Sequence, residues 1–544
     1  MIARLRTPLL LAPAVLFLGA FFVWPVANIV GEGLRTQRGW DLSGVEAVLA
    51  DDGLRQVLWF TTWQAAASTA LTLALALPAC HVLARIDFPG RAALRALVVV
   101  PFVLPTVVVG AAFLALVGPR GVLGIDLRGS AWAILLAHAF FNVAVVVRVV
   151  GGLWEQLDPR TEEAARVLGA GRWRAFQAVT WPALRPAVRS ASVIVFLFTF
   201  TSFGIVQLVG GGRRVTLEVE IYRQTADLLD LPVASVLALV QLTAVGALLA
   251  VQDRLERRRT ATAVAMRPVA PRRPRGRGER AWVALNLSVL AVLLGAPVVT
   301  LVERSLRTSD GGHGLAAWRA LADEGGTGLF VAPLEAVGNS LRFAAIATVT
   351  AVAIGGSAAV ALARSTGRWA RALDAVLLLP LGTSAVTVGF GFILALDRPV
   401  DLRASPLLVP LAQALVALPF VVRTMTPVLR AIDPRLRDAA AVLGASPART
   451  WRAVDLPLVR RALAVSAGFA YAISLGEFGA TTVIARADAP TVPVAIDRLL
   501  SRPGALSASQ AFALSSLLMA LTAAAVLLVD RWRPRGEASS GGWL

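Results

Sequence analysis

The sequence contains no lysine, one cysteine and three histidines among its 544 residues. Without lysine, a phosphate-binding loop of the G-x-x-x-x-G-K-[ST] type cannot exist in this chain. The lone cysteine, Cys80, excludes a disulfide framework within the chain, and its place in an apolar run favours a packing role. His81, His138 and His313 are scattered without the spacing of metal ligands, so no metal site is predicted.

Charged residues are also scarce, since they make up 16% of the sequence whereas hydrophobic residues make up 57%. No soluble globular class has this composition. About twelve apolar runs are long enough to cross a hydrocarbon core, beginning near residues 8, 56, 97, 131, 190, 231, 281, 338, 372, 406, 462 and 508. The first run, Leu9 to Val30, is too long for the apolar region of a secretory signal and is expected to remain as a span. The sequence therefore predicts an all-α integral membrane protein.

The net charge of +19 would suit a nucleic-acid partner, but the distribution of arginine argues against one. If the N-terminus is cytoplasmic and the spans alternate, most arginine-rich loops fall on the cytoplasmic side, as the positive-inside rule requires. No basic patch interleaved with aromatic residues stands apart from the span flanks, so no nucleic acid is predicted. The basic rim instead suits anionic lipid headgroups. We expect a multi-pass membrane protein with both termini in the cytoplasm.

The chain divides into two similar halves. Residues 1–258 and 281–544 each contain six predicted spans, and residues 259–280 form a proline- and arginine-rich linker that is expected to be solvated and cytoplasmic. At an offset of 275 residues Phe203 and Gly204 match Phe478 and Gly479, and with a small shift of register Gly110 matches Gly389. An even number of spans gives both halves the same orientation, which predicts a parallel repeat with a pathway between the halves.

The most polar stretch of the chain occurs twice. Residues 158–187 read DPRTEEAARVLGAGRWRAFQAVTWPALRPA, and residues 433–462 read DPRLRDAAAVLGASPARTWRAVDLPLVRRA. In each copy Asp-Pro begins a short helix, and Gly169 or Gly444 ends it in the left-handed conformation. A second short helix is expected to follow, closed by Pro182 or Pro457 before the next span. Because helices of this length are not stable alone in water, each must be held by packing.

Small side chains form one face of each short helix and would let another surface approach closely. Two interpretations are open: a hairpin resting on the membrane surface, or a docking element for another protein. Two copies at one register on the same side of the membrane, ahead of equivalent spans, favour docking. The face comprises Ala164, Ala165 and Leu168 in the first copy and Ala439, Ala440 and Leu443 in the second.

The motif EEAARVLGA, with DAAAVLGA in the second half, resembles the cytoplasmic loop of permease subunits of binding-protein-dependent ABC importers. The resemblance implies a fold of the MetI type, with two parallel six-helix repeats and no catalytic activity of its own. It also implies that these loops are coupling helices for a separate ATPase dimer, which would bind ATP and magnesium, and that an extracytoplasmic substrate-binding protein delivers the solute. The implied coupling residues are Glu163, Ala164, Ala165, Leu168 and Gly169, with Asp438, Ala439, Ala440, Leu443 and Gly444 in the second half.

Fusion of both permease halves in one chain resembles the ferric-iron and thiamine permeases. The stretches HAFFNVAVVVR (138–148), VGGGRRVTLEVEIY (209–222) and SLGEFGA (474–480) are most similar to the thiamine group. The resemblance therefore implies a small, cationic solute, with thiamine favoured over ferric iron.

One carboxylate, Glu477, lies inside the eleventh apolar run. A charged residue inside the membrane is costly, about 2.5 to 3.5 kcal/mol on insertion scales, so its carboxylate needs a role that offsets this cost. Glu477 either lines a water-filled pathway and attracts a cation, or pairs with an arginine or backbone N–H groups to hold a broken helix. The candidate pathway residues are Thr201, Ser202, Phe203, Ser474, Glu477 and Phe478.

A secondary active transporter, which would need no ATPase, is the main alternative. Genes for an ATPase and a secreted binding protein beside the gene for this chain would favour the importer. A membrane enzyme is disfavoured because carboxylates, histidines and serines lack the spacing of a nucleophile and its base.

Overall fold

The computed structural model describes residues 2–530 except 37–38, 41–42, 120, 262–269, 309–310, 324–330, 366, 368–372, 375, 381–382 and 398–400. The regular secondary structure of the described residues is helical apart from one pair of two-residue strands, β1 (Arg35–Thr36) and β2 (Gly39–Trp40), and two isolated bridges. Mostly helical structure follows from the long apolar runs, because helices satisfy their own backbone hydrogen bonds within a bilayer.

The first half contains fourteen α-helices in the described residues. They are α1 (Ile2–Leu18), α2 (Trp24–Leu34), α3 (Ser43–Ala50), α4 (Asp52–Arg85), α5 (Arg91–Val103), α6 (Thr106–Val117), α7 (Ala131–Val146), α8 (Gly152–Gln156), α9 (Pro159–Val167), α10 (Arg172–Ala175), α11 (Trp181–Phe200), α12 (Gly204–Val209), α13 (Leu217–Tyr222) and α14 (Leu231–Ala261). The π turns Gly19–Val23, Val147–Gly151, Phe176–Thr180 and Arg223–Asp227 join or extend several of them.

The second half repeats this order. Its helices are α15 (Gly276–Ser305), α16 (Ala316–Arg319), α17 (Pro333–Arg364), α19 (Ala385–Ala395), α20 (Leu408–Arg430), α21 (Pro434–Val442), α22 (Pro447–Thr450), α23 (Leu456–Gly476), α24 (Gly479–Ile484), α25 (Val492–Leu500) and α26 (Ala505–Asp530), with a π turn at Trp451–Asp455.

Ten of the predicted spans are single helical segments that are long and apolar enough to cross a membrane. The third predicted span is instead a bent pair, because α5 and α6 meet at 106° across Leu104 and Pro105. The ninth is represented by the shorter α19, and part of that apolar run lies outside the described residues. The prediction of about twelve spans in an all-α membrane fold agrees with this architecture.

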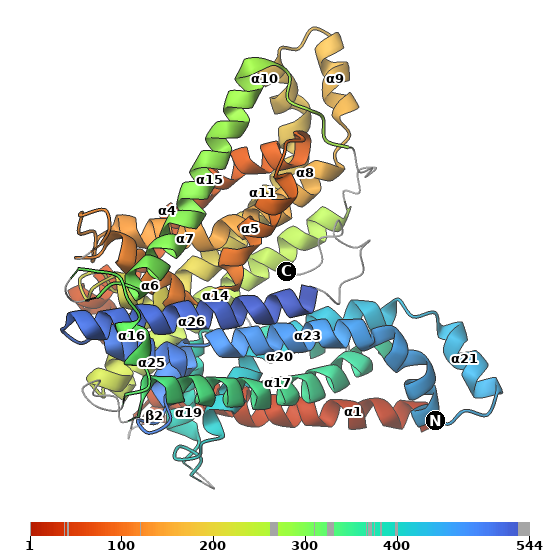
Figure 1. Ribbon diagram of the computed structural model, residues 1–544. Coiled ribbons are helices and arrows are strands. Elements are labelled where there is room, and N and C mark those ends of the chain that lie inside the picture. The colour runs from red at the N-terminus through yellow and green to blue at the C-terminus, as the bar shows by residue number, and fades with distance from the viewer. Residues whose placement is uncertain are drawn as a thin grey trace.

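The first span of each half packs against the other half. Helix α1 lies along α17, α2 contacts α19, and α15 contacts α4, α5 and α6. Figure 1 shows the consequence as two arms, with α1 in the arm that ends at α21 and α15 in the arm that ends at α9. The Trp24 indole Nε1 donates a hydrogen bond to the carbonyl oxygen of Ala395 at 3.1 Å. The two sequence halves are therefore interlocked.

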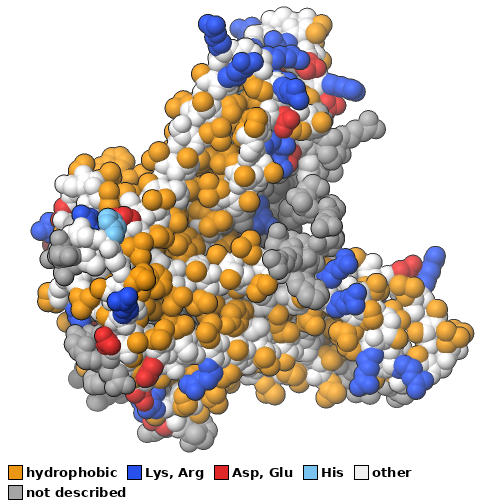
Figure 2. All heavy atoms as spheres, in the orientation of Figure 1, with side chains coloured by type: hydrophobic (Ala, Val, Ile, Leu, Met, Phe, Trp, Pro, Cys, Tyr) orange, Lys and Arg blue, Asp and Glu red, His pale blue; other side chains and the backbone are white. Residues whose placement is uncertain are grey.

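Three hydrophobic clusters stabilise this arrangement. One cluster takes buried side chains from both halves, including Phe203 and Phe478. Another lies mainly in the first half but includes Leu290 of α15, and a third lies mainly in the second half but includes Phe17 of α1. Figure 2 shows hydrophobic side chains over the middle of the visible face and charged ones gathered at the arm tips and at the opposite end. This distribution suits a multi-pass membrane protein.

Matched glycines allow close helix packing in each half. A Cβ on Gly110 of α6 would lie 2.8 Å from Cδ1 of Leu208 in α12. A Cβ on Gly389 of α19 would lie 2.9 Å from the carbonyl oxygen of Ala480 in α24. The sequence match between the two glycines therefore corresponds to one packing contact that occurs in both halves.

The linker between the halves is partly structured. Helix α14 extends to Ala261, and α15 begins at Gly276, inside the predicted linker 259–280, of which residues 262–269 lie outside the described part. Arg272 pairs with the chain that follows α4, because its N–H donates to the Arg85 carbonyl at 3.1 Å and its carbonyl accepts from the Asp87 N–H at 2.8 Å. Arg272 also binds Glu279 through two guanidinium hydrogen bonds of 2.7 Å each.

Candidate functional site

The repeated polar segments form two matched helices at the tips of the two arms (Figure 1). Asp158 caps α9 by accepting a hydrogen bond from the Arg160 N–H at 2.9 Å. Asp433 caps α21 in the same way, from the Arg435 N–H at 2.9 Å. Pro159 and Pro434 occupy the first helical position, where a missing N–H costs nothing. The predicted helix starts are therefore correct.

The helix ends match as well. Gly169 has φ +92° and Gly444 has φ +76°, both in the left-handed region that favours glycine. In the first copy the Gly169 N–H donates to Arg166 at 3.0 Å and the Ala170 N–H to Ala165 at 3.1 Å. This bond pair defines a Schellman C-cap. The second copy repeats both bonds at 3.0 Å, from Gly444 to Ala441 and from Ala445 to Ala440.

The expected second short helices begin as predicted, as α10 and α22, but their predicted ends are wrong in both copies. Helix α10 continues through a π turn into α11, so that residues 172–200 form one helical segment, and residues 447–476 do the same in the second half. Pro182 and Pro457 therefore do not end a helix. Each lies just after a π turn, Phe176–Thr180 or Trp451–Asp455. A wider turn relieves the clash between the proline ring and the preceding carbonyl, so the helix can continue.

Each helix tip presents two apolar side chains to solvent. Val167 and Leu168 are 87% and 88% exposed, and Val442 and Leu443 are both 86% exposed. Such side chains normally cover one another or a partner, and here the same pair is exposed at both tips. The leucines are among the predicted docking residues and the valines are not, although the VLGA shared by the two copies could have identified them.

The remaining predicted docking residues lie beside these pairs. Glu163, Ala164, Asp438 and Ala439 are exposed, whereas Ala165 and Ala440 are half-buried. Within the described part of the chain, neither Glu163 nor Asp438 is in an ion pair. The structure thus gathers the predicted residues on two open surfaces, one at each tip.

Helices α9 and α21, called the docking helices after their predicted role, are anchored at equivalent positions by different chemistry. In the first half the Thr180 hydroxyl donates to Glu162 Oε2 at 2.6 Å. In the second half Arg437 and Asp455 occupy these positions, and Arg437 Nε lies 2.7 Å from Asp455 Oδ1. Arg364, at the end of α17, adds a contact of 3.1 Å to Asp455 Oδ2. The acidic group lies on the docking helix in one half and on the following helix in the other.

The candidate pathway residues lie where helices break at the interface between the halves. Thr201, Ser202 and Phe203 separate α11 from α12, and Glu477 and Phe478 separate α23 from α24. The rings of Phe203 and Phe478 are 5.1 Å apart, so the two breaks meet. A Cβ on Gly476 would lie 3.1 Å from Pro105, which brings the α5–α6 break to the same place.

Glu477 holds its own broken helix. Its carboxylate accepts hydrogen bonds from the Ala480 N–H at 2.7 Å and the Thr481 N–H at 3.0 Å, at the start of α24. This geometry corresponds to the alternative in which backbone N–H groups hold a broken helix. Ser202 is buried, Thr201 is half-buried, and the buried Ser474 hydroxyl has no hydrogen-bond partner among the described residues.

A second buried carboxylate, missed in the sequence, lies at the same interface between the halves. Glu218 of α13 is 1% exposed and accepts a hydrogen bond from Gln241 Nε2 at 2.6 Å. Its other oxygen accepts from the Ser384 hydroxyl, at the start of α19 in the second half. Thr387 completes the network by donating to Gln241 Oε1 at 3.0 Å. The charged residue inside the apolar stretch VTLEVEIY was the available signal.

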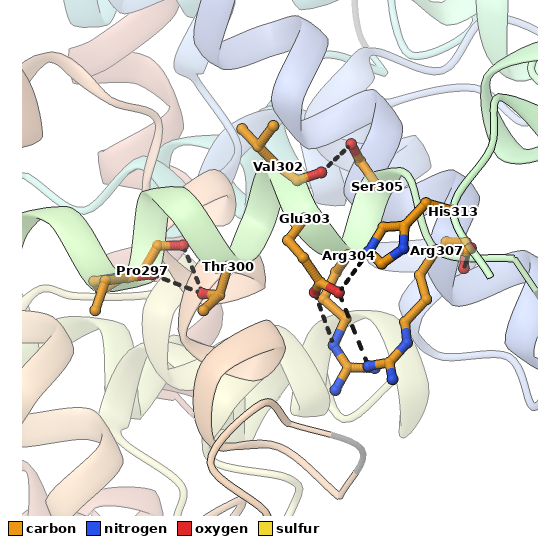
Figure 3. A network of polar contacts seen from close by, with 10 residues as sticks. Pro297, Thr300, Val302, Glu303, Arg304, Ser305, Arg307 and His313 are labelled. Carbon is orange, nitrogen blue, oxygen red and sulfur yellow. Dashed lines mark hydrogen bonds and ion pairs between the residues drawn. The ribbon is translucent and has the colours of Figure 1, made fainter. Parts of the chain in front are cut away.

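A separate polar network closes the other end of α15. Figure 3 shows Glu303 facing His313 and two arginines. His313 Nε2 lies 3.3 Å from Glu303, and Arg304 and Arg307 lie at 3.7 Å and 4.0 Å. The groups hold the turn after α15, where Gly314 N–H donates to the Leu306 carbonyl at 2.7 Å. We interpret this cluster as structural.

Comparison with known proteins gives a consistent result. Residues 68–261 match the family described as binding-protein-dependent transport system inner membrane component. This segment contains the first docking helix, the α11–α12 break and Glu218.

Similarity to curated proteins extends over most of the chain. It is 29% identical to the thiamine transport system permease protein ThiP of Brucella abortus (strain 2308) over 503 residues, 88% of either chain. It is 28% identical to the protein of the same name from Escherichia coli (strain K12), covering 82% of this chain and 84% of the relative. A probable ABC transporter permease protein of Sinorhizobium fredii is 27% identical over 88% of each chain. These alignments include both halves.

Proposed function

From the premise that this chain is a two-repeat permease of the binding-protein-dependent transport type, we propose that it carries thiamine across the bacterial inner membrane, with energy from a separate ABC ATPase dimer. The names of its relatives in Brucella and Escherichia support thiamine over ferric iron. An extracytoplasmic binding protein would deliver the solute.

The paired docking tips carry this proposal. Two capped helices expose the same Val-Leu pair at the ends of two arms, which suits two equivalent grooves on a dimer. The lack of lysine supports a separate ATPase, because a chain without lysine has no phosphate-binding loop of the Walker type. ATP and magnesium would therefore bind to the partner and not to this chain.

Transport would proceed by alternating access between the interlocked halves. ATP binding would draw the two ATPase subunits together, and the docking helices would transmit that movement to the arms. The helix breaks at Phe203 and Phe478 would then separate on one side of the membrane and close on the other. In this orientation α9, α21 and both termini face the cytoplasm.

Reconstitution tests the proposal against a secondary transporter. The purified chain is placed in liposomes with an ABC ATPase and a thiamine-binding protein from the same organism, and uptake of radiolabelled thiamine is measured. We expect uptake only with ATP and all three components, and no ATP hydrolysis by the chain alone. Thiamine uptake by the isolated chain, driven by an ion gradient, would refute the importer.

A further inference from the structure

We propose that Glu218 is the group that recognises the positive charge of the cargo at the interface between the two halves. This inference rests on the proposed function and assigns its cation specificity to one side chain. Glu218 is on α13, in the first half, and its carboxylate bonds directly to Ser384 of the second half. The carboxylate therefore lies at the surface along which the halves must separate.

Every hydrogen bond that the structure gives this carboxylate comes from a neutral donor. Gln241 Nε2 donates to one oxygen at 2.6 Å and the Ser384 hydroxyl donates to the other. Glu220 and Asp455 differ, since Glu220 lies 3.8 Å from Arg223 and Asp455 lies between two arginines. Glu477 also has neutral donors only, but these are the backbone N–H groups at the start of α24. A carboxylate that is buried in a membrane protein and held by neutral side chains, without a basic partner, is by default a candidate functional group.

In the second half Pro493 stands at the position equivalent to Glu218, and the buried carboxylate of that helix, Asp497, lies one turn further along α25. Tyr222 lies one helical turn after Glu218 and so faces the same side of α13. Its ring is 5.4 Å from Phe203, which is 5.1 Å from Phe478.

Aromatic faces beside one carboxylate form the surroundings that suit a monovalent organic cation. A hard metal ion instead favours a shell of several oxygen ligands. The geometry thus favours a flat, heteroaromatic cation as the cargo, consistent with the thiazolium ring of thiamine.

The groups that surround the Glu218 carboxylate explain why a cation could reach it only when the two halves have moved apart. Ser384 and Thr387 begin α19 and belong to the second half, whereas Glu218 and Gln241 belong to the first. In this state the Ser384 hydroxyl occupies a position that a cation would take. When the halves part, Ser384 moves away with α19 and the carboxylate becomes free to bind.

The test compares Glu218→Gln with the matched variant Glu220→Gln on the same helix. Both substitutions remove one buried carboxylate and preserve its size. Uptake of radiolabelled thiamine is measured in liposomes containing the complete complex, together with uptake of an isostere whose thiazolium nitrogen is replaced by carbon. The readout is the ratio of thiamine uptake to uptake of the uncharged isostere. We expect at least a tenfold fall of this ratio for Glu218→Gln and less than a threefold change for Glu220→Gln.

A third variant separates charge recognition from structural support. Glu218→Asp shortens the side chain but keeps its charge, so the ratio should stay within threefold of the wild type even where total uptake falls. A purely structural role predicts lower uptake of both compounds in Glu218→Gln with an unchanged ratio, and that result would overturn the inference. An unchanged uptake in Glu218→Gln would do the same.

A failure of the proposed function can be distinguished from a failure of this inference. If the wild-type complex takes up no thiamine, its thermal stabilisation is compared for choline and for 3,3-dimethyl-1-butanol, an uncharged carbon isostere of choline. A preference for choline that Glu218→Gln removes would support the inference alone. No preference for choline in the wild type would refute it.

Discussion

At the scale of single residues, the two docking helices show how one contact can be made from different side chains. Glu162 and Thr180 form a hydrogen bond in the first half, and Arg437 and Asp455 form an ion pair at the same positions. Asp455 is 0% exposed and also binds Arg364. Removing the acid leaves two guanidinium groups facing each other without a counter-charge. The second docking helix thus depends on a charge pair that the first lacks.

The exchange of these pairs gives a testable prediction. Arg437→Glu alone places two carboxylates together and should lower the melting temperature and thiamine uptake. We expect a loss of about 1 to 3 kcal/mol, below the range for fully buried pairs, because both arginines are partly exposed. The double variant Arg437→Glu with Asp455→Thr copies the first half and should recover most of the loss. A double variant as unstable as the single one would show that the two anchors are not equivalent.

Gly169 provides a second prediction at this scale. A Cβ at this position meets nothing within 4 Å, so only its φ of +92° opposes substitution. Gly169→Val should therefore distort the C-cap at a local cost of about 1 to 2 kcal/mol. Recovery of the ATPase in pull-downs should fall while expression stays normal. The control is Gly171→Val, because Gly171 has an ordinary φ of −62° and equal space around it. Equal effects of the two variants would contradict the role of the left-handed cap.

At the scale of helices, the exposed tips can be tested directly. Leu168 and Leu443 contribute almost nothing to the core, so Leu168→Ser and Leu443→Ser should change stability by less than about 0.5 kcal/mol. Loss of apolar contact should nevertheless reduce ATPase recovery and uptake, as should Ala164→Arg and Ala439→Arg. A hairpin resting on lipid predicts little harm from an added arginine, which would meet anionic headgroups. Normal ATPase recovery in all four variants would refute docking.

The same helices show how far the sequence could be interpreted. Asp-Pro and glycine are local signals, and they predicted both ends of α9 and α21 correctly. The continuation of α10 into α11 could not be predicted, because a π turn before Pro182 leaves no distinct pattern in side-chain type. The bend between α5 and α6 could not be predicted either, because hydropathy shows the length and apolarity of a run but not the direction of the helix axis.

At the scale of the whole molecule, the packing of the first span of each half against the other half could not be predicted from the sequence, for a related reason. Twelve apolar runs and a repeat predict two halves, but nothing local indicates that α1 packs on α17 and α15 on α6. Those contacts are long-range, and apolar surfaces of spans resemble one another. Glu218 was not predicted because it lies between two long apolar runs, whereas Glu477 lies inside one. Only the structure shows which carboxylate caps a helix and which one joins the two halves.

Interlocking predicts that the halves assemble after the chain is cut in the linker. Residues 1–265 and 266–544 expressed together should copurify, because each half keeps the span that packs against the other. The control removes the N-terminal residues 1–34 from the first piece, which eliminates α1 and α2 and their contacts with α17 and α19. Copurification should then fall several-fold. Pieces that copurify equally well without α1 and α2 would contradict the interlocked arrangement.

A parallel repeat requires equivalent loops to lie on one side of the membrane, and cysteine labelling can decide this. Cys80 is buried and is replaced by serine to give a background without reactive thiols. Single cysteines are then introduced for Arg174 and Arg449, near the two docking helices, and for Arg213 and Ala489, in loops that follow α12 and α24. An impermeant maleimide added to intact spheroplasts should label positions 213 and 489 but reach 174 and 449 only after lysis. An even number of spans per half is what enforces this pairing. Labelling of 174 and 449 from opposite sides would make the repeat antiparallel, and the two docking tips could then not contact one ATPase dimer.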